Sequence, residues 1–309
     1  MTNVLLTGAG GFLGTKIKDS VLSKNGCALK LIDLHSIAVA SPVNLSSDFS
    51  LVPKDEKPID IVFHSAGKAH VVPKTESERQ EFFNVNFTGT KNLCSALDRA
   101  QRLPRSFIFI STVSVYGLDE GENISEDHPL NGNSPYAKSK ILAEQWLQDW
   151  ASKRGITLGI LRLPLLAGAN PPGNLGAMIS GIDKGRYLSI GQASARKSMV
   201  WAEDIAEIVP RLAQTGGIYN LTDGQHPSFG ELEEIIAKGL GRKKPLHVPH
   251  WFAKSLALTG DLLGRRFPID SDKLTKITST LTFDDSKARQ EIGWNPSKVL
   301  DKLPSIFHV

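Results

Sequence analysis

Three glycines spaced three residues apart follow directly on the first strand-like run of the chain. The run "NVLLTG" from Asn3 leads into "TGAGGFLG", where Gly8, Gly11 and Gly14 recur and Phe12 opens a helical pattern. Glycine at a strand-to-helix turn lets backbone N–H groups approach a pyrophosphate at the positive end of the helix. We therefore predict a dinucleotide site at this turn, formed by Gly8, Gly11, Phe12, Leu13 and Gly14.

A carboxylate at the end of the second strand-like run strengthens this prediction. Asp33 lies 19 residues after Gly14, which is the position where an acidic side chain binds a ribose 2′-hydroxyl. Such a carboxylate repels a 2′-phosphate, so NAD is favoured as the cofactor and NADP is the possible alternative. The competing interpretation of Asp33 is a helix or turn cap.

Short apolar runs alternate with longer helical patterns along the first half of the chain. This alternation predicts a parallel sheet covered by helices on both faces. The predicted strands begin at Asn3, Leu29, Asp60, Ser106 and Thr157, and the predicted helices cover 12–23, 78–100 and 136–153. After Arg162, Gly and Pro become dense and the alternation is lost. We expect a dinucleotide-binding domain over 1–165 and a substrate domain over 166–309, with 198–214 able to pack back onto the first.

Composition and charge narrow the classes of function. The 309 residues are 40% hydrophobic and 22% charged, with a net charge of +4, which is ordinary for a globular protein. A strand-like run from Asn3 and the lack of 18 consecutive apolar residues predict a cytoplasmic protein without an integral membrane segment. The basic runs at 241–244 and 264–266 carry no aromatic interleaving, so no nucleic-acid partner is expected. Cys27 and Cys94 lack metal-ligand spacing, and no metal site is predicted.

A tyrosine and a lysine stand four residues apart in "SPYAKSK", at the start of a predicted helix. Residues at i and i+4 share one helix face, so Tyr136 and Lys140 point the same way. Taken alone, the pair could be a ring packed on a lysine stem. Beside a nicotinamide, however, the positive charges of Lys140 and the ring would favour the phenolate and lower the tyrosine pKa from about 10, which suits general acid–base catalysis.

Two hydroxyl residues end the strand that begins at Ser106. Ser111 and Thr112 would lie at the carboxyl edge of the sheet, where open parallel sheets bind ligands. A hydroxyl there could hold the reacting oxygen against Tyr136. The alternative is a polar strand end without a role in chemistry.

These residues carry a resemblance that spans nearly the whole chain. The motifs are "TGAGGFLG", "VFHSAGKAHV" from Val62, "NVNFTGT" from Asn84, "STVSVYG" followed by "YAKSK", "ARKSMVWAEDIAEIV" from Ala195 and "FDDSKARQEIGWNP" from Phe283. In this order they resemble the extended short-chain dehydrogenase/reductase family, the nucleotide-sugar epimerases and reductases. The resemblance implies a Rossmann-type doubly wound parallel sheet with a smaller C-terminal substrate-binding α/β domain.

The resemblance also implies residue roles. Tyr136 would be the catalytic acid/base, Lys140 would bind the nicotinamide ribose and lower the tyrosine pKa, and Thr112 would be the third catalytic residue, in contact with substrate. Further cofactor contacts are expected from Ser65, Ala66, Gly67, Asn86 and Ser111.

The resemblance places a UDP-sugar in the second unit. Asn174 would contact the diphosphate, unless it is only a helix N-cap. Lys197 stands where the family usually carries an arginine, with Arg196 beside it. Because a lysine cannot form a bidentate fork with phosphate, either residue could make the contact.

The reaction type can be narrowed by subtraction. Val113 and Ser114 replace the Asp-Glu pair of the 4,6-dehydratase branch, so a 4-epimerase or a 4-ketoreductase remains. The expected substrate is a UDP-N-acetyl-hexosamine or its 6-deoxy-4-keto form in polysaccharide biosynthesis. Pro164 and Leu165 replace the Asn of many galactose-type epimerases, which slightly favours the reductase. The competing class is a non-catalytic dinucleotide-sensing regulator, which usually lacks the Tyr–Lys pair.

The sequence also predicts a dimer interface and an apolar helix near the C-terminal end. The predicted helices over 78–100 and from Tyr136 could pair with their copies in a homodimer. The stretch Trp251 to Phe267 is apolar and ends in basic residues. We interpret it as a helix packed on the substrate domain, with a membrane-surface helix as the alternative.

Overall fold

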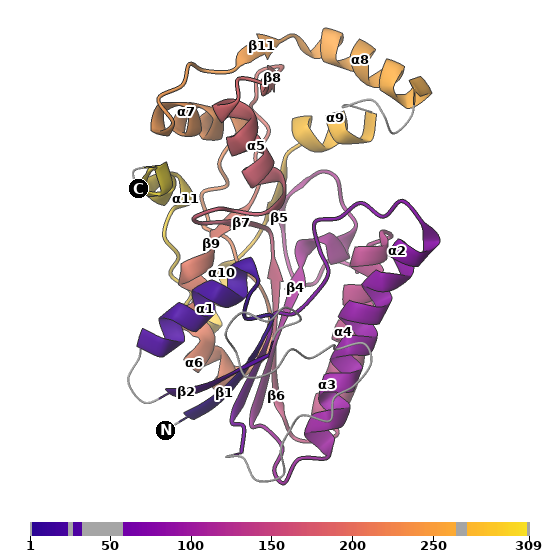
Figure 1. Ribbon diagram of the computed structural model, residues 1–309, viewed down its shortest axis with the longest axis vertical. Coiled ribbons are helices and arrows are strands. Elements are labelled where there is room, and N and C mark those ends of the chain that lie inside the picture. The colour runs from indigo at the N-terminus through magenta and orange to yellow at the C-terminus, as the bar shows by residue number, and fades with distance from the viewer. Residues whose placement is uncertain (1, 24–26, 33–57, 264–270, 308–309) are drawn as a thin grey trace.

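The computed structural model describes residues 2–23, 27–32, 58–263 and 271–307. Its central feature is a six-stranded parallel sheet (Figure 1) in the order β10-β6-β4-β3-β1-β2. The strands are β1 (Thr2–Thr7), β2 (Cys27–Ile32), β3 (Ile61–His64), β4 (Ser106–Thr112), β6 (Thr157–Leu163) and β10 (Gly217–Asn220). The sheet confirms the predicted α/β class.

Helices cover both faces of this sheet (Figure 1). On one face, α3 (Gly89–Asp98) and α4 (Pro135–Ser152) pack on the sheet through a core that includes Leu93, Phe107 and Leu147. On the other face, α1 (Phe12–Ser23) and α6 (Ile205–Thr215) share a core with Leu6 and Leu161. This arrangement is the doubly wound fold that the alternation of strands and helices predicts.

The helix expected over 78–100 is three segments. A capping box between Thr75 and Glu78 starts α2 (Glu76–Phe82), a π-helical segment follows over Phe83–Thr88, and α3 continues from it. Helix periodicity alone does not distinguish a π-helical turn from α-helix. Such turns are frequent at functional sites, and this one carries the buried Asn86.

The rest of the chain forms a smaller α/β unit at one end of the sheet (Figure 1). Its core lies between α5, α7 and α11 and includes Met178, Ile236 and Leu303. Because α6 and β10 pack with the central sheet, the two units interleave along the sequence. The elements not yet named are β5 (Gly121–Ile124), β7 (Leu165–Ala167), α5 (Gly173–Asp183), β8 (Leu188–Ile190), β9 (Met199–Trp201), α7 (Phe229–Gly239), β11 (Leu246–Val248), α8 (His250–Leu263), α9 (Ser271–Thr278), β12 (Leu281–Phe283), α10 (Ser286–Ile292) and α11 (Val299–Lys302).

A buried histidine connects β1, β3 and α3. The Nδ1 atom of His64 lies 2.6 Å from Thr7 Oγ1, and its Nε2 atom lies 2.9 Å from Thr90 Oγ1. The ring is fully buried. Burial, with a smaller contribution from the Lys140 charge, lowers the pKa of His64 from 6.5 to about 3. The histidine is therefore neutral in the native protein and has a structural role.

This histidine should make the protein less stable in mild acid. The unfolded chain protonates His64 near pH 6.5 and the native chain only near pH 3, so the unfolded state binds more protons between these values. Its contribution to the free energy of unfolding should fall by about 1.4 kcal/mol per pH unit below pH 6.5. Urea unfolding at several pH values, compared with a His64→Asn variant, measures the difference in slope. Equal slopes for the two proteins would contradict the prediction.

Candidate active site

The end of β4 and the first turns of α4 bring the predicted catalytic residues together. Helix α4 begins at Pro135, and the Ser134 hydroxyl caps it by accepting the Ala137 N–H at 3.1 Å. Tyr136 lies in the first turn and Lys140 in the next. The Tyr136 phenol shares a hydrogen bond with the Thr112 side chain. Thr112 and Tyr136 therefore lie together, Lys140 lies one helical turn further along α4, and their shared catalytic role stays a prediction.

The pKa of Tyr136 departs from our expectation in direction. Burial raises it above its ordinary value of 10.0, and the hydrogen bond with Thr112 lowers it by less. We expected the Lys140 ammonium to lower the Tyr136 pKa, but Lys140 is not among the groups that shift it. A positive nicotinamide ring beside Tyr136 would lower this pKa, because a nearby positive charge favours the phenolate.

Lys140 is the buried cation of the site. Its Nζ donates to the Ile110 carbonyl at 2.8 Å and lies 4.5 Å from the centre of the Phe109 ring. Burial lowers the Lys140 pKa from 10.5 to about 8, and the Glu144 carboxylate acts in the opposite direction. An ammonium has three N–H donors, so further donors remain for a ribose hydroxyl.

A glycine keeps the space above Lys140 open. A Cβ added at Gly67 would lie 3.0 Å from Asn86 Oδ1 and 3.3 Å from Lys140 Nζ. Asn86 accepts the Lys68 N–H at 2.7 Å and donates to Ser139 Oγ at 3.0 Å. Asn86 therefore ties the segment after β3 to the first turns of α4, and its predicted cofactor contact stays a prediction.

The glycine turn has the geometry of a pyrophosphate site. Gly8 adopts a φ of +72°, and a Cβ there would lie 2.6 Å from the Ala66 nitrogen. A Cβ at Gly14 would lie 1.9 Å from the Gly8 carbonyl oxygen. Only glycines permit this close approach of β1, α1 and the segment after β3, so these residues fit a dinucleotide.

The other residues predicted to bind the cofactor take different positions. The Leu13 side chain packs into the core, and Phe12 lies against the same core, so these two would contribute through the backbone. The Ser65 hydroxyl donates to the Thr7 carbonyl at 2.7 Å. Asp33 lies outside the described residues.

A buried ion pair beneath the site was not predicted. Arg162 Nη2 lies 2.7 Å from Glu144 Oε2, and both side chains are almost fully buried. Ser111 donates its hydroxyl to the same carboxylate. Two signals in the sequence could have revealed the pair. Arg162 interrupts an apolar strand, and Glu144 follows Lys140 by one helical turn.

In the smaller unit, the two neighbouring cations differ. Arg196 donates to the His226 carbonyl at 2.9 Å and pairs with Glu231 at 3.4 Å. Lys197 is partly buried and forms no ion pair within 4 Å with any carboxylate in the described part of the chain. Burial lowers the Lys197 pKa to about 8. Asn174 is exposed in the first turn of α5, whose N-cap is Pro172, so the capping alternative is wrong.

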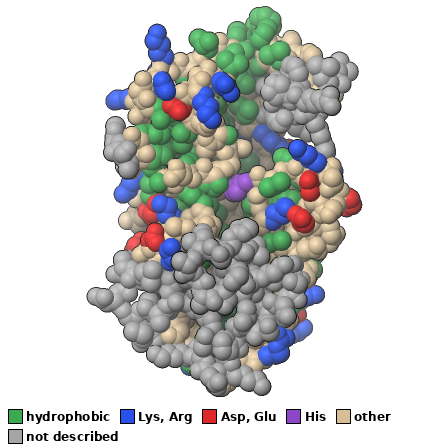
Figure 2. Space-filling model, viewed as in Figure 1, with side chains coloured by type: hydrophobic (Ala, Val, Ile, Leu, Met, Phe, Trp, Pro, Cys, Tyr) green, Lys and Arg blue, Asp and Glu red, His purple; other side chains and the backbone are tan. Residues whose placement is uncertain are grey.

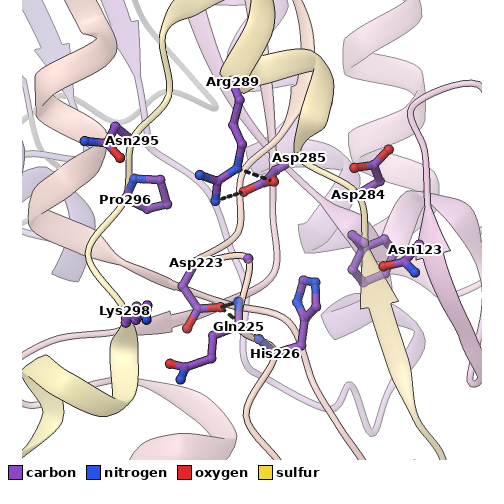
Figure 3. Close-up of a pocket in the computed structure, with 12 residues that line it drawn as sticks. Asn123, Asp223, Gln225, His226, Asp284, Asp285, Arg289, Asn295, Pro296 and Lys298 are labelled. Atoms are coloured by element: carbon purple, nitrogen blue, oxygen red, sulfur yellow. Dashed lines mark hydrogen bonds and ion pairs between the residues drawn. The ribbon is translucent and has the colours of Figure 1, made fainter.

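A separate polar pocket of about 630 Å³ lies between the loop after β10, the start of α10 and the segment before α11 (Figure 3). Arg289 pairs with Asp285 at 2.8 Å, and Asp223 accepts the backbone N–H groups of Gln225 and His226. None of the predicted catalytic residues lines it. Its carboxylates are engaged by Arg289, by backbone N–H groups and by Ser286, so we interpret the pocket as structural.

Residues 2–23, 27–32, 58–263 and 271–307 contain no cluster of three or more His, Cys, Asp or Glu side chains placed to hold a metal ion. No helix among them has both the length and the apolar character needed to cross a bilayer.

Comparison with known proteins identifies the family. Residues 4–222 match the model of the NAD dependent epimerase/dehydratase family. The chain belongs to this family. The match covers the glycine turn, Thr112, Tyr136 and Lys140, and it confirms the resemblance on which the predicted roles depend.

Three similar proteins extend the match to nearly the whole chain. N-acetyl-α-D-glucosaminyl-diphospho-ditrans,octacis-undecaprenol 4-epimerase of Escherichia coli O157:H7 is 26% identical over 92% of this chain and 88% of its own. UDP-glucose 4-epimerase of Vibrio cholerae is 28% identical over 97% and 92%. UDP-glucose 4-epimerase of Thermotoga maritima, solved with UDP-glucose, superposes with a TM-score of 0.78 at 20% identity and covers 99% of this chain and 97% of its own. This member of the family is an NAD(P)-dependent enzyme, as predicted.

The positions of the side chains in this epimerase/dehydratase site suggest a chemical role for each. A nicotinamide bound beside them would take up or deliver the hydride. Thr112 and Tyr136 converge on one point, where they would hold the reacting oxygen and where Tyr136 would exchange its proton. Lys140, fixed by Ile110, would hold the nearby ribose through its free N–H groups.

Tyr136→Phe should keep the fold and NAD binding while lowering turnover by about 10²- to 10⁴-fold, because only the proton-exchanging hydroxyl is lost. Steady-state kinetics and NAD titration measure the two effects. Tyr187→Phe, in the smaller unit, is the matched control and should retain activity. Near-normal turnover by Tyr136→Phe would remove this residue from the mechanism.

Proposed function

We propose that this enzyme is a 4-epimerase acting on a UDP-N-acetyl-hexosamine in polysaccharide biosynthesis. The observation that carries the proposal is the contact between Tyr136 and Thr112, one helical turn from the buried Lys140, in a chain whose relatives over nearly its whole length include two 4-epimerases. An epimerase removes a hydride from C4 and returns it to the opposite face. Tyr136, with Thr112 beside it, could first accept the C4 hydroxyl proton and then return it, which suits this cycle.

The 4-ketoreductase remains the alternative within the same site. It is favoured by Pro164 and Leu165, which offer no side-chain amide to the sugar. Both residues are partly buried at the step from β6 to β7. The relatives outweigh this feature, because apolar residues at one substrate contact are compatible with either reaction.

Lys197 is the residue we assign to the diphosphate. Arg196 is engaged by Glu231 and by the His226 carbonyl, whereas Lys197 is partly desolvated, forms no ion pair within 4 Å among the described residues, and feels the Asp119 carboxylate only at longer range. A desolvated ammonium gains more from an anion than an exposed one does. Asn174, exposed at the start of α5, would contribute a second contact to the same group.

A second candidate keeps the chemistry and changes the carrier of the sugar. The relative from Escherichia coli O157:H7 acts on a sugar joined through a diphosphate to undecaprenol. A diphosphate contact through Lys197 does not distinguish this lipid carrier from uridine.

We place the enzyme in the cytoplasm as a homodimer that pairs through α3 and α4, where Leu142 is 39% exposed.

A substrate panel tests the proposal. The purified enzyme, without added cofactor, should interconvert UDP-N-acetylglucosamine and UDP-N-acetylgalactosamine, because the cofactor is regenerated in each cycle. Lys197→Gln should raise KM by about tenfold, the loss of one charge-assisted contact, while Arg196→Gln should leave KM near normal. The products are separated by chromatography.

Each remaining arm of the panel has a distinct outcome. Turnover of a polyprenyl-diphospho-sugar in place of the UDP-sugars would assign the lipid carrier. Stoichiometric consumption of NADH or NADPH by a UDP-4-keto-sugar without interconversion would contradict the epimerase and assign the reductase. Binding of NAD without turnover of any sugar would assign the regulator.

A further inference from the structure

Helix α8 exposes three large apolar side chains and buries small residues on its opposite face. Ala253, Ala257 and Gly260 form the buried face, and the two alanines pack with Leu274 of α9. Trp251 is 70% exposed and Leu258 is 54% exposed, and Phe252 beside them is 45% exposed. This is the reverse of a helix that is apolar in order to cover a protein core.

The apolar surface continues onto the short sheet before α8. Leu246 of β11 and Leu188 of β8 are register partners, and they are 77% and 48% exposed. Figure 2 shows hydrophobic side chains gathered at the end of the molecule where Figure 1 places β11 and α8. We call Leu188, Leu246, Trp251, Phe252 and Leu258 the α8 surface.

Basic side chains border the α8 surface. Lys243 and Lys254 are exposed and form no ion pair with a carboxylate in the described ranges. The neighbouring acidic side chains are already engaged. Asp183 pairs with Arg242, Glu234 pairs with Lys244, and Asp261 accepts hydrogen bonds from Ser271. The two ion pairs cancel, and the charge of Asp261 offsets one of the two lysines, so these side chains carry a surplus of one positive charge.

We propose that the α8 surface docks the enzyme on a lipid bilayer that carries anionic headgroups. Tryptophan, phenylalanine and leucine on one face with lysine at the edge are the composition of an interfacial helix. Each lysine near an anionic surface adds electrostatic attraction to it. The 14 residues of α8 make it about 21 Å long, which suits a helix lying in the plane of the interface.

Charge favours the bilayer over a second copy of the chain. A symmetric pairing of two α8 surfaces would bring the same lysines of both copies together, whereas anionic headgroups complement them. Vesicles that contain no sugar report on this surface alone, so a failure to bind them is distinguishable from a failure of the proposed 4-epimerase activity.

Vesicle binding tests the proposal directly. The enzyme should co-sediment with vesicles of equal parts phosphatidylcholine and phosphatidylglycerol and should bind pure phosphatidylcholine more weakly. Trp251 is the exposed tryptophan, since Trp150, Trp201 and Trp294 are buried and Trp146 is half-buried. Its insertion should therefore shift the tryptophan emission to shorter wavelength.

Two double variants distinguish binding through the α8 surface from non-specific apolar adsorption to vesicles. Trp251→Ser with Phe252→Ser should weaken binding to the mixed vesicles by about tenfold or more, because two interfacial anchors are lost. Val71→Ser with Val72→Ser, which removes another pair of exposed apolar residues, should leave binding unchanged. Both variants should keep the wild-type unfolding midpoint and NAD affinity.

The proposal is overturned if the wild-type enzyme does not sediment with the mixed vesicles, or if the Trp251/Phe252 variant binds them as the wild type does. Sedimentation velocity without lipid tests whether a second copy of the chain occupies the α8 surface instead. A wild-type dimer that becomes a monomer in this variant, without vesicle binding by the wild type, would assign the α8 surface to a second copy of the chain.

Discussion

The ion pair between Glu144 and Arg162 is the interaction on which the site depends. Removing two charges from water costs several kcal/mol for each ion, which is offset only when the remaining donors and acceptors are satisfied. Here Ser111 donates to the carboxylate, and Arg162 donates at 3.1 Å to the Tyr116 hydroxyl, which in turn donates at 2.7 Å to Asn220. The network therefore joins β4, α4, β6 and β10 beneath the catalytic residues.

Two properties of the site follow from this pair. Ser111 precedes Thr112, and Glu144 follows Lys140 by one helical turn, so the pair fixes the end of β4 against the helix that carries Tyr136 and Lys140. The Glu144 charge also opposes the effect of burial on Lys140 and keeps its pKa as high as about 8. Without this carboxylate, the ammonium would lose its proton at a lower pH. Glu144 is therefore a positioning residue that acts through Lys140.

Local patterns in the sequence predicted much of this site, and tertiary contacts supplied the rest. Thr112 ends a strand and Tyr136 and Lys140 have helical spacing, so fold class and spacing were enough to bring them together. The partners Glu144 and Arg162 come from different elements: the sequence marks each as unusual, an arginine in an apolar strand and a carboxylate one turn after Lys140, but only the tertiary structure shows that they meet. The raised pKa of Tyr136 was likewise missed, because burial depends on packing that spacing does not reveal. The roles of Asn174 and Lys197 remain predictions.

The pH dependence of kcat in a Glu144→Gln variant tests this account most directly. We predict that the limb of lost activity at high pH, which reports deprotonation of the Lys140 ammonium, moves to lower pH in the variant. A conservative Glu144→Asp substitution should restore it in part. A variant that only loosened the fold would lose activity equally at all pH values. A high-pH limb that stays at the wild-type position in Glu144→Gln would contradict the claim that the buried pair sets the state of Lys140.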